Sequence, residues 1–325
     1  MNMVDVLTHA SARAALLRCP ASDLDVGGPW LFWSAPPTPA LRRSLENRGQ
    51  LIPVLVDASG ARPVLVAGAA RVRVLAELGR EALCLDLGAM DGQARGLAYV
   101  QSNAGREVSD GQVVLAMRYF QTLPDCDQAA VLESLGLEPR SKRLRLVRSF
   151  LSLPGRWDEF LCAGAVPLAC ADLLEAFAPG DLEALEALFT TLSWSRGSAV
   201  NVLTWIREIC ARDQAAVGDV LDGAGVKDIL AGGLSPKDAM NRITQEVRLL
   251  RYPALSGMER DFLTAARAVS AGTRWRVTQP DLFESDAVEV CARLTSPDAV
   301  RAASAELARI AAREDLDDLF VVGRE

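Results

Sequence analysis

The first third of the chain alternates between short apolar runs and helical apolar spacing. Three runs, LIPVLVD (51–57), PVLVAG (63–68) and ALCLDL (82–87), have the length and composition of strands. Two helical segments, LRRSLENRG (41–49) and AARVRVLAEL (69–78), lie before the first and third runs and end at a glycine. This order predicts a compact layer of strands and helices. Ahead of it, Trp30, Phe32 and Trp33 predict an apolar strand edge packed on the same layer.

The middle of the chain has helical spacing almost throughout. Residues 109–123 predict a helix with Ser109 as N-cap, and two shorter helices follow around Gly136, the second beginning after Pro139 and Ser141. Amphipathic segments continue to about residue 254. From residue 255 the order changes to helix, two alternating strands (273–279 and 287–294), and a helix capped by Ser296.

These patterns predict an α+β protein: a small sheet-containing domain, an all-helical middle with a helix-turn-helix, and a small helix-strand-strand-helix domain. Its 325 residues are enough for two or three domains, and an apolar fraction of 50% excludes a largely disordered chain. The expected segments are 1–40 (irregular), 41–108 (sheet domain), 109–180 (helix-turn-helix), 181–254 (helical extension), 255–316 (C-terminal domain) and 317–325 (acidic and apolar tail).

Composition excludes several classes of site. Seven cysteines are scattered without a CxxC pair, which predicts buried small apolar residues rather than a disulfide framework or a zinc site. His9 is the single histidine, so a histidine base or a His-rich metal centre is not expected. We assign no catalytic and no metal-binding residue. No apolar run reaches the roughly 20 residues of a membrane span, and the start lacks a secretory pattern, so we expect a cytoplasmic protein.

Charge is distributed very unevenly along the chain. Its 35 Lys and Arg against 42 Asp and Glu give −7, yet residues 139–157 carry six basic residues and no acid, so the remainder carries −13. In a helix-turn-helix, cations near the start of the second helix reach base edges and phosphates in the major groove. The alternative is a solvated basic helix with no ligand. The candidate DNA-binding residues are Arg140, Ser141, Lys142, Arg143, Arg145 and Arg148.

The same region resembles the ParB/Spo0J family of chromosome and plasmid partition proteins. The resemblance rests on LGL at 135–137, the basic helix, LSLP at 151–154 and LCAGAVPLACADLL at 161–174. In the last segment Gly164, Val166, Ala171 and Leu174 stand in the matching places. The family's His is Cys170 here and its following Arg is Asp172. The resemblance implies binding of double-stranded DNA at a short, palindromic site.

The sheet region resembles the N-terminal domain of the same family. Its motifs are matched at Gly49, Pro53, Gly68, Arg71, Arg73 and Gly79, and a second motif at Asn103 and Arg106. The resemblance implies that Gly68, Arg71, Asn103 and Arg106 face the triphosphate of CTP, with Mg²⁺ beside it. Ala69, Ala70 and Ser102 replace the family's Glu, Arg and metal-facing Glu. We therefore predict that CTP and Mg²⁺ bind poorly or not at all and that CTP is not hydrolysed.

Together these features predict a ParB-like DNA-binding protein that supports plasmid, phage or chromosome segregation on the nucleoid or plasmid. By the same resemblance, residues 255–316 would form a homodimer and a ParA-type ATPase would be a partner. Two alternatives stay open. One is a transcriptional regulator on this scaffold, and the other is a CTP-dependent DNA clamp with CTPase activity.

Overall fold

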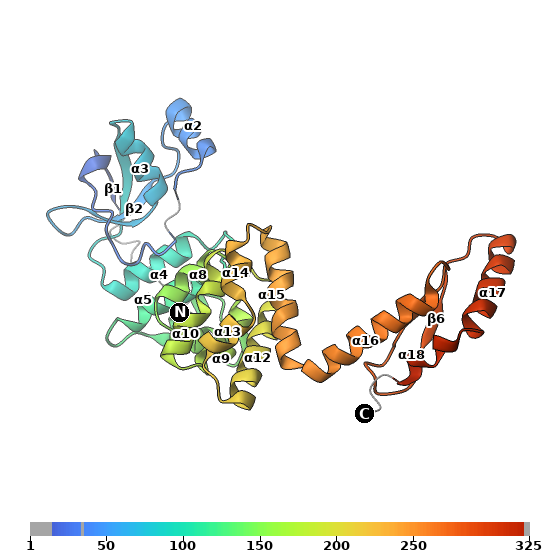
Figure 1. Cartoon of the computed structure of the whole chain (residues 1–325). Helices are drawn as coiled ribbons and strands as arrows, with labels where there is room; N and C mark the ends of the chain where they lie inside the picture. The colour runs from blue at the N-terminus through green and yellow to red at the C-terminus, as the bar shows by residue number, and fades with distance from the viewer. Residues whose placement is uncertain (1–14, 34–35, 322–325) are drawn as a thin grey trace. The chain divides into compact units, whose positions relative to one another are not determined.

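The computed structural model describes residues 15–33 and 36–321. His9, the single histidine, and Val322, in the expected tail, lie outside the described residues. The chain divides into two compact units, Met1–Leu203 and Thr204–Glu325, and the border falls inside helix α12 (Arg196–Asp213) (Figure 1). The finer division into six segments stays a prediction.

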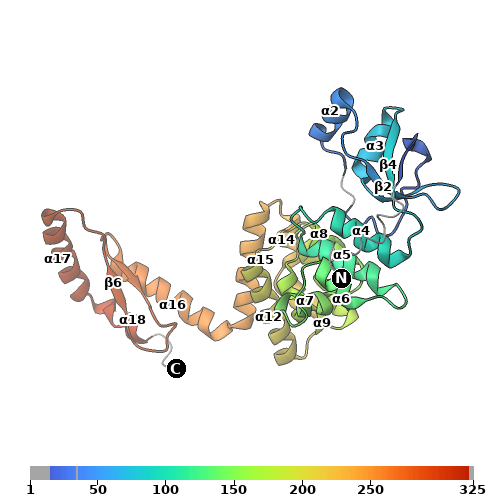
Figure 2. The ribbon, with the colours of Figure 1, turned by 180° about the vertical axis from the view of Figure 1, so that it is seen from behind.

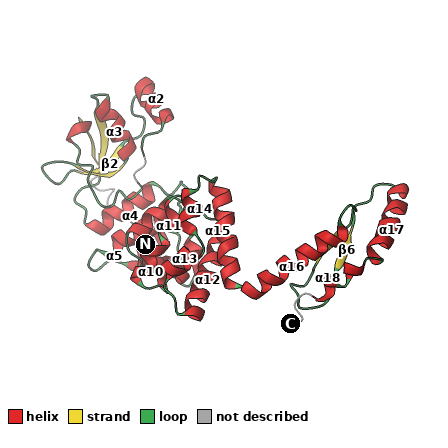
Figure 3. Ribbon diagram, in the orientation of Figure 1, coloured by secondary structure: helices red, strands yellow, loops and turns green. Residues whose placement is uncertain are grey.

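A four-stranded sheet forms the N-terminal part of the first unit, with strand order β1-β4-β2-β3. Its strands are yellow in Figure 3. The strands are β1 (Ala15–Pro20), β2 (Val54–Asp57), β3 (Val64–Ala67) and β4 (Glu81–Asp86). β4 pairs antiparallel with β1 and parallel with β2, and β2 pairs antiparallel with β3. The apolar runs predicted as strands are confirmed as β2, β3 and β4. Their inward side chains and those of helix α3 (Ala69–Glu77) form one core, including Val54, Val56, Leu65, Val72 and Leu75.

The strand expected at Trp30, Phe32 and Trp33 is wrong. These residues lie in a loop after the short helix η1 (Ala21–Asp23), and the extra strand is β1, fifteen residues earlier than the aromatic cluster begins. Both tryptophans are buried, and each buried indole N–H has a backbone carbonyl as its partner. Trp30 Nε1 donates to Leu65 O at 2.9 Å, and Trp33 Nε1 donates to Gln112 O at 3.0 Å.

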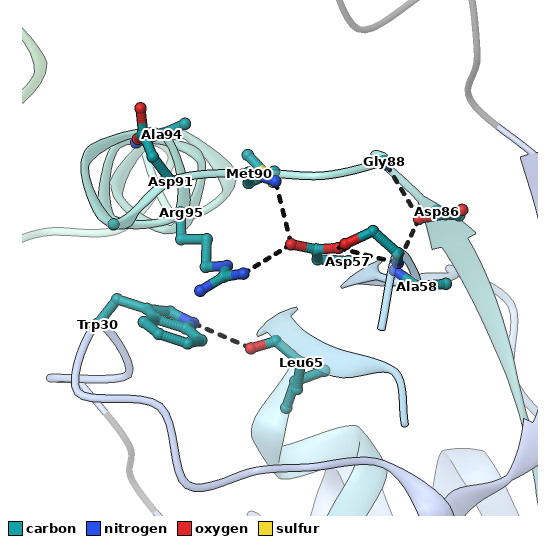
Figure 4. Close-up of polar contacts among 12 residues, drawn as sticks. Trp30, Asp57, Ala58, Leu65, Asp86, Gly88, Met90, Asp91, Ala94 and Arg95 are labelled. Atoms are coloured by element: carbon teal, nitrogen blue, oxygen red, sulfur yellow. Dashed lines mark hydrogen bonds and ion pairs between the residues drawn. The ribbon is translucent and has the colours of Figure 1, made fainter. Parts of the chain in front are cut away.

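An acidic residue at the end of β2 joins the sheet to the next helix, α4 (Gly92–Ser102) (Figure 4). Asp57 is 1% exposed, and its Oδ2 accepts from Arg95 Nη2 at 2.7 Å and from Met90 N at 3.1 Å. Its Oδ1 accepts from Ser59 Oγ at 2.6 Å. Burial alone would raise the pKa of Asp57, but these hydrogen bonds lower that pKa to about 2. Arg95 also lies over the Trp30 ring, 5.0 Å from its centroid.

Helices make up the rest of the first unit. α2 (Pro39–Arg48) ends at Gly49 as predicted, and α5 (Asp110–Gln121) begins with a capping box between Ser109 and Gln112. The remaining elements before α12 are α6 (Gln128–Ser134), α7 (Lys142–Leu151), α8 (Arg156–Cys162), η2 (Leu168–Cys170), α9 (Ala171–Glu175), α10 (Pro179–Leu185) and α11 (Ala187–Thr190). Trp157, fully buried, packs edge-on against Phe160 and Phe189 and anchors this core.

The second unit continues with α13 (Val217–Gly223), α14 (Val226–Ala231) and α15 (Pro236–Arg251), so the helical spacing read to residue 254 is confirmed. The C-terminal order is also as predicted: α16 (Pro253–Ser270), β5 (Arg276–Thr278), β6 (Glu289–Cys291) and α17 (Pro297–Ala311), followed by η3 (Glu314–Leu316) and α18 (Asp318–Val321). The core of this C-terminal part is small, with Phe262, Ala266, Val269, Val277, Ile310 and Leu319. In the described part of the chain, no helix is long and apolar enough to span a bilayer.

Candidate nucleic-acid interface and nucleotide pocket

The segment predicted as a helix-turn-helix contains two short helices, α6 and α7, joined through a glycine turn (Figure 2). Asp127 caps α6 by accepting from Ala129 N and Ala130 N. The chain then reverses at Gly136, whose φ of 64° lies in the left-handed region. Ser141 caps α7: its Oγ accepts from Leu144 N at 3.2 Å and donates to Glu138 O at 2.9 Å. The side chain of Ser141, one of the candidate DNA-binding residues, is therefore used to cap the N-terminus of α7.

The two faces of α7 differ sharply in polarity. Leu144, Leu146, Val147 and Phe150 are buried and fix the helix on its neighbours. Lys142, Arg145 and Arg148 recur every third residue and are exposed, and Arg140 is exposed just before the helix. We call Arg140, Lys142, Arg145 and Arg148 the basic row. Cations at this spacing lie along one side of the helix, where they meet an approaching polyanion together.

Two arginines of α7 are paired with carboxylates from other helices. Arg143 Nε and Nη2 both donate to Asp110 Oδ1, at 3.0 and 2.8 Å, and Arg145 Nη2 lies 2.9 Å from Asp172 Oδ2. The first pair joins α7 to the start of α5 and the second joins it to α9. Within the described residues, Arg140, Lys142 and Arg148 have no hydrogen-bond or ion-pair partner on their side chains. The candidate cations thus fall into a paired and an unpaired set.

The fold adds one cation that the sequence analysis missed. Arg196, at the start of α12, lines an open pocket of about 340 Å³ together with Lys142, Arg143 and Asp110. Three cations against one carboxylate make this pocket attractive to an anion. Arg196 lies outside the acid-free run, and no pattern in the sequence indicates that α12 begins beside α7.

A second site lies at the N-terminus of α3, where a cavity of about 370 Å³ is lined by all four predicted nucleotide residues, Gly68, Arg71, Asn103 and Arg106. Gly68 precedes α3 with φ 110°, and a Cβ there would lie 2.6 Å from Val54 Cγ1, so only glycine fits. Because Gly68 offers no side-chain cap, the first N–H groups of α3 are available to a ligand.

The side chains in this pocket are largely used within the protein. Arg71 Nη1 donates to Ile52 O at 2.9 Å and to Pro53 O at 2.7 Å, and Asn103 Nδ2 donates to Tyr99 O at 2.8 Å. Burial, and then the charge of Arg106, lowers the pKa of Arg71. The described residues that line the cavity include no carboxylate. Among the described residues, no group of three or more His, Cys, Asp or Glu could hold a metal ion.

No family model matches the chain, and no curated protein matches its sequence. Solved structures do match parts of it. A C-terminally truncated chromosome-partitioning protein ParB from Caulobacter crescentus, complexed to the centromeric parS site, is 17% identical over 58% of this chain and 98% of its own, with a TM-score of 0.36. A Pnob8-like ParB-N domain is 16% identical over 55% of this chain and 90% of its own, with a TM-score of 0.37.

A third match is the truncated C. crescentus ParB complexed with CTP-gamma-S. It is 17% identical over 54% of this chain and 98% of its own, with a TM-score of 0.24. All three matched chains are ParB proteins, the family that the sequence resembles.

Proposed function

We propose that this protein is a ParB-like DNA-binding protein that recognises a short duplex site through α6 and α7 and supports the segregation of a plasmid, phage or chromosome. The observation that carries the proposal is the basic row on the solvent side of α7, a helix whose opposite face is buried. We further propose a ParA-type ATPase as partner, from the family resemblance of the sequence.

The dimensions and charges of α7 suit a major groove. A helix is about 10–12 Å across with its side chains, which fits a groove about 12 Å wide, and the 10 residues of α7 extend about 15 Å along it. Lys142, Arg145 and Arg148 would meet phosphates and base edges along one side of it. Arg140 and Arg196 flank the start of the helix and extend the positive surface. Each phosphate neutralised makes binding more dependent on salt, so the number of contacts is measurable.

The test is a salt titration of duplex binding by fluorescence anisotropy, using the full chain and a random-sequence duplex of 24 base pairs. Lys142→Ala and Arg148→Ala each remove an unpaired cation and should lower the salt slope by about one unit. Arg143→Ala and Arg145→Ala should lower it less, because a carboxylate already neutralises each of them. Arg43→Ala, an exposed arginine of α2, is the matched control. If all four α7 variants keep the affinity and slope of Arg43→Ala, the helix is not the DNA-binding surface.

We also propose that the C-terminal part, residues 255–316, holds two chains together. Val290 lies directly opposite Val277 across the β5–β6 pair, but Val277 is buried and Val290 is 39% exposed. Val300 and Leu307, two turns apart on α17, are exposed as well. A two-stranded sheet with so small a core is only marginally stable by itself, and a second copy would cover these apolar side chains.

We propose that the cavity at α3 binds a nucleotide weakly at most. The helix terminus supplies N–H groups, and Arg106 supplies a cation. Mg²⁺ favours carboxylate oxygens, which the described lining does not provide. We therefore propose that DNA binding does not depend on CTP.

A further inference from the structure

The two carboxylates that pair with arginines of α7 come from two different helices. Asp110 is the first residue of α5, and Asp172 lies in the first turn of α9. We propose that Asp110 and Asp172 are positioning residues that set the sequence specificity of DNA binding, by holding Arg143 and Arg145 for base contacts and opposing their use on phosphates. The inference rests on the proposed DNA-binding function.

The Arg143–Asp110 pair leaves a defined part of the guanidinium free. Asp110 Oδ1 accepts from both Nε and Nη2, so the carboxylate occupies the Nε edge of Arg143. The end of the fork, with Nη1 and the second N–H of Nη2, stays available. That end is the part that can donate two hydrogen bonds to O6 and N7 of a guanine. A carboxylate on the other edge removes rotational freedom that the arginine would otherwise lose on binding.

Asp110 is well placed to hold Arg143. It lies in the first turn of α5, where the helix dipole stabilises a negative charge. The side chain of Arg143 is 41% exposed and that of Asp110 is 42% exposed, so both groups remain at the surface that a duplex would approach. The two side chains are held by their hydrogen bonds to each other and by the packing of α5 against α7, and not by burial.

Arg145 is held more loosely, through one contact of 2.9 Å to Asp172 Oδ2, and it is 64% exposed at the centre of the basic row. Asp172 is 41% exposed and remains beside it. A DNA phosphate that takes either arginine must displace a carboxylate or lie next to one, and both outcomes cost free energy. This cost applies to every duplex. A base contact that leaves the carboxylate in place is available only at the correct sequence.

The experiment starts with selection of bound duplexes from a random-sequence pool by the full-length wild-type chain. Affinity for a selected duplex and for its scrambled counterpart is then measured for Asp110→Asn and Asp172→Asn. Removing either carboxylate should add up to one phosphate contact. Such a contact would raise the scrambled-duplex affinity up to about eightfold at 0.1 M salt and steepen the salt slope by up to about one unit. The ratio of selected to scrambled affinity should fall by about tenfold where a bidentate base contact is lost.

Three comparisons separate the inference from its alternatives. Glu46→Gln, an exposed acid of α2 without an ion-pair partner among the described residues, controls for the change in net charge. Asp110→Glu and Asp172→Glu keep the carboxylate and should keep the low scrambled-duplex affinity. If Asp110→Asn and Asp172→Asn match Glu46→Gln in affinity, slope and ratio, the carboxylates do not set specificity. If the wild type itself enriches no duplex and binds none, the proposed function fails together with the inference.

Discussion

Replacing Asp57 by Asn tests the polar network that joins β2 to α4. The carboxylate is 1% exposed and accepts from Arg95, Met90 and Ser59. Its pKa is about 2 instead of 3.8, and a shift of one unit corresponds to 1.36 kcal/mol, so the charged form contributes about 2 kcal/mol to stability at neutral pH. Asn keeps the shape but has no negative charge to pair with Arg95, and it has one acceptor oxygen where the carboxylate uses two. Because Arg95 is 24% exposed and can recruit water, we expect a loss of about 2–3 kcal/mol.

The pH dependence of this loss follows from the sign of the shift. The pKa of Asp57 is lower in the folded state than in the unfolded state, so its contribution is fully present above about pH 5. It declines as the pH falls, because the unfolded chain takes up the proton first, and it vanishes below about pH 2. By pH 3 about half of the stability contributed by Asp57 should be lost. The stability difference between wild type and Asp57→Asn should therefore shrink on acidification.

Hydrogen exchange measured by mass spectrometry reports the loss of stability around Asp57 locally. A local measurement is needed because a chain of two units need not unfold in one step. Peptides from β2, β4 and α4 should lose protection in the variant at pH 6 and lose much less at pH 3. Peptides from α16 and α17 serve as the internal control and should not change. The reasoning is refuted if the sheet peptides keep full protection at pH 6, or if the difference from wild type is the same at both pH values.

Two further outcomes follow from the other proposals. Removing residues 256–325 should give a monomer at micromolar concentration in sedimentation velocity, and a truncated protein that still sediments as a dimer would put the interface elsewhere. Calorimetry with CTP and Mg²⁺ should give poor or undetectable binding, with no CTP turnover in the presence or absence of DNA. Low-micromolar binding would mean that the missing charges at Ala70 and Ser102 matter less than we infer.

In the N-terminal sheet, the strands that the sequence predicted are those with an uninterrupted apolar run. β2, β3 and β4 each bury at least two residues, so apolar composition alone marks them. β1 pairs with β4 on one side only and buries none of its residues, and ALLRCP has little periodicity to detect. The aromatic cluster at 30–33 misled for a related reason. Its apolar side chains made it resemble a strand. In the structure, however, its indole nitrogens donate hydrogen bonds to distant carbonyls, and no strand ladder forms there.

The candidate sites were predictable to the extent that their residues are close in sequence or follow a known motif. Three residues of the basic row lie within α7 and the fourth, Arg140, lies just before it, so their exposed spacing follows from helical geometry. The carboxylates that pair with arginines of α7 do not have this advantage. Asp110 precedes Arg143 by 33 residues, and no local rule brings the first turn of α5 to the side of α7. Arg196 was missed for the same reason, since it is 54 residues from Lys142 in the sequence and only the fold brings the two to one pocket.

Arg71 has a structural role that is independent of any nucleotide. Of the three positions 69–71, which are charged in the motif at α3, Arg71 alone keeps its charge, and this by itself would favour a working phosphate site. However, its Nη1 donates to two consecutive carbonyls, Ile52 and Pro53, in the loop that leads into β2. Gln50 Nε2 also donates to Ile52 O, at 3.1 Å, so Arg71 and Gln50 together hold this loop as the chain enters the core. Arg71 is therefore engaged with the backbone whether or not an anion binds, and Arg106 and the helix terminus are the groups left for a nucleotide.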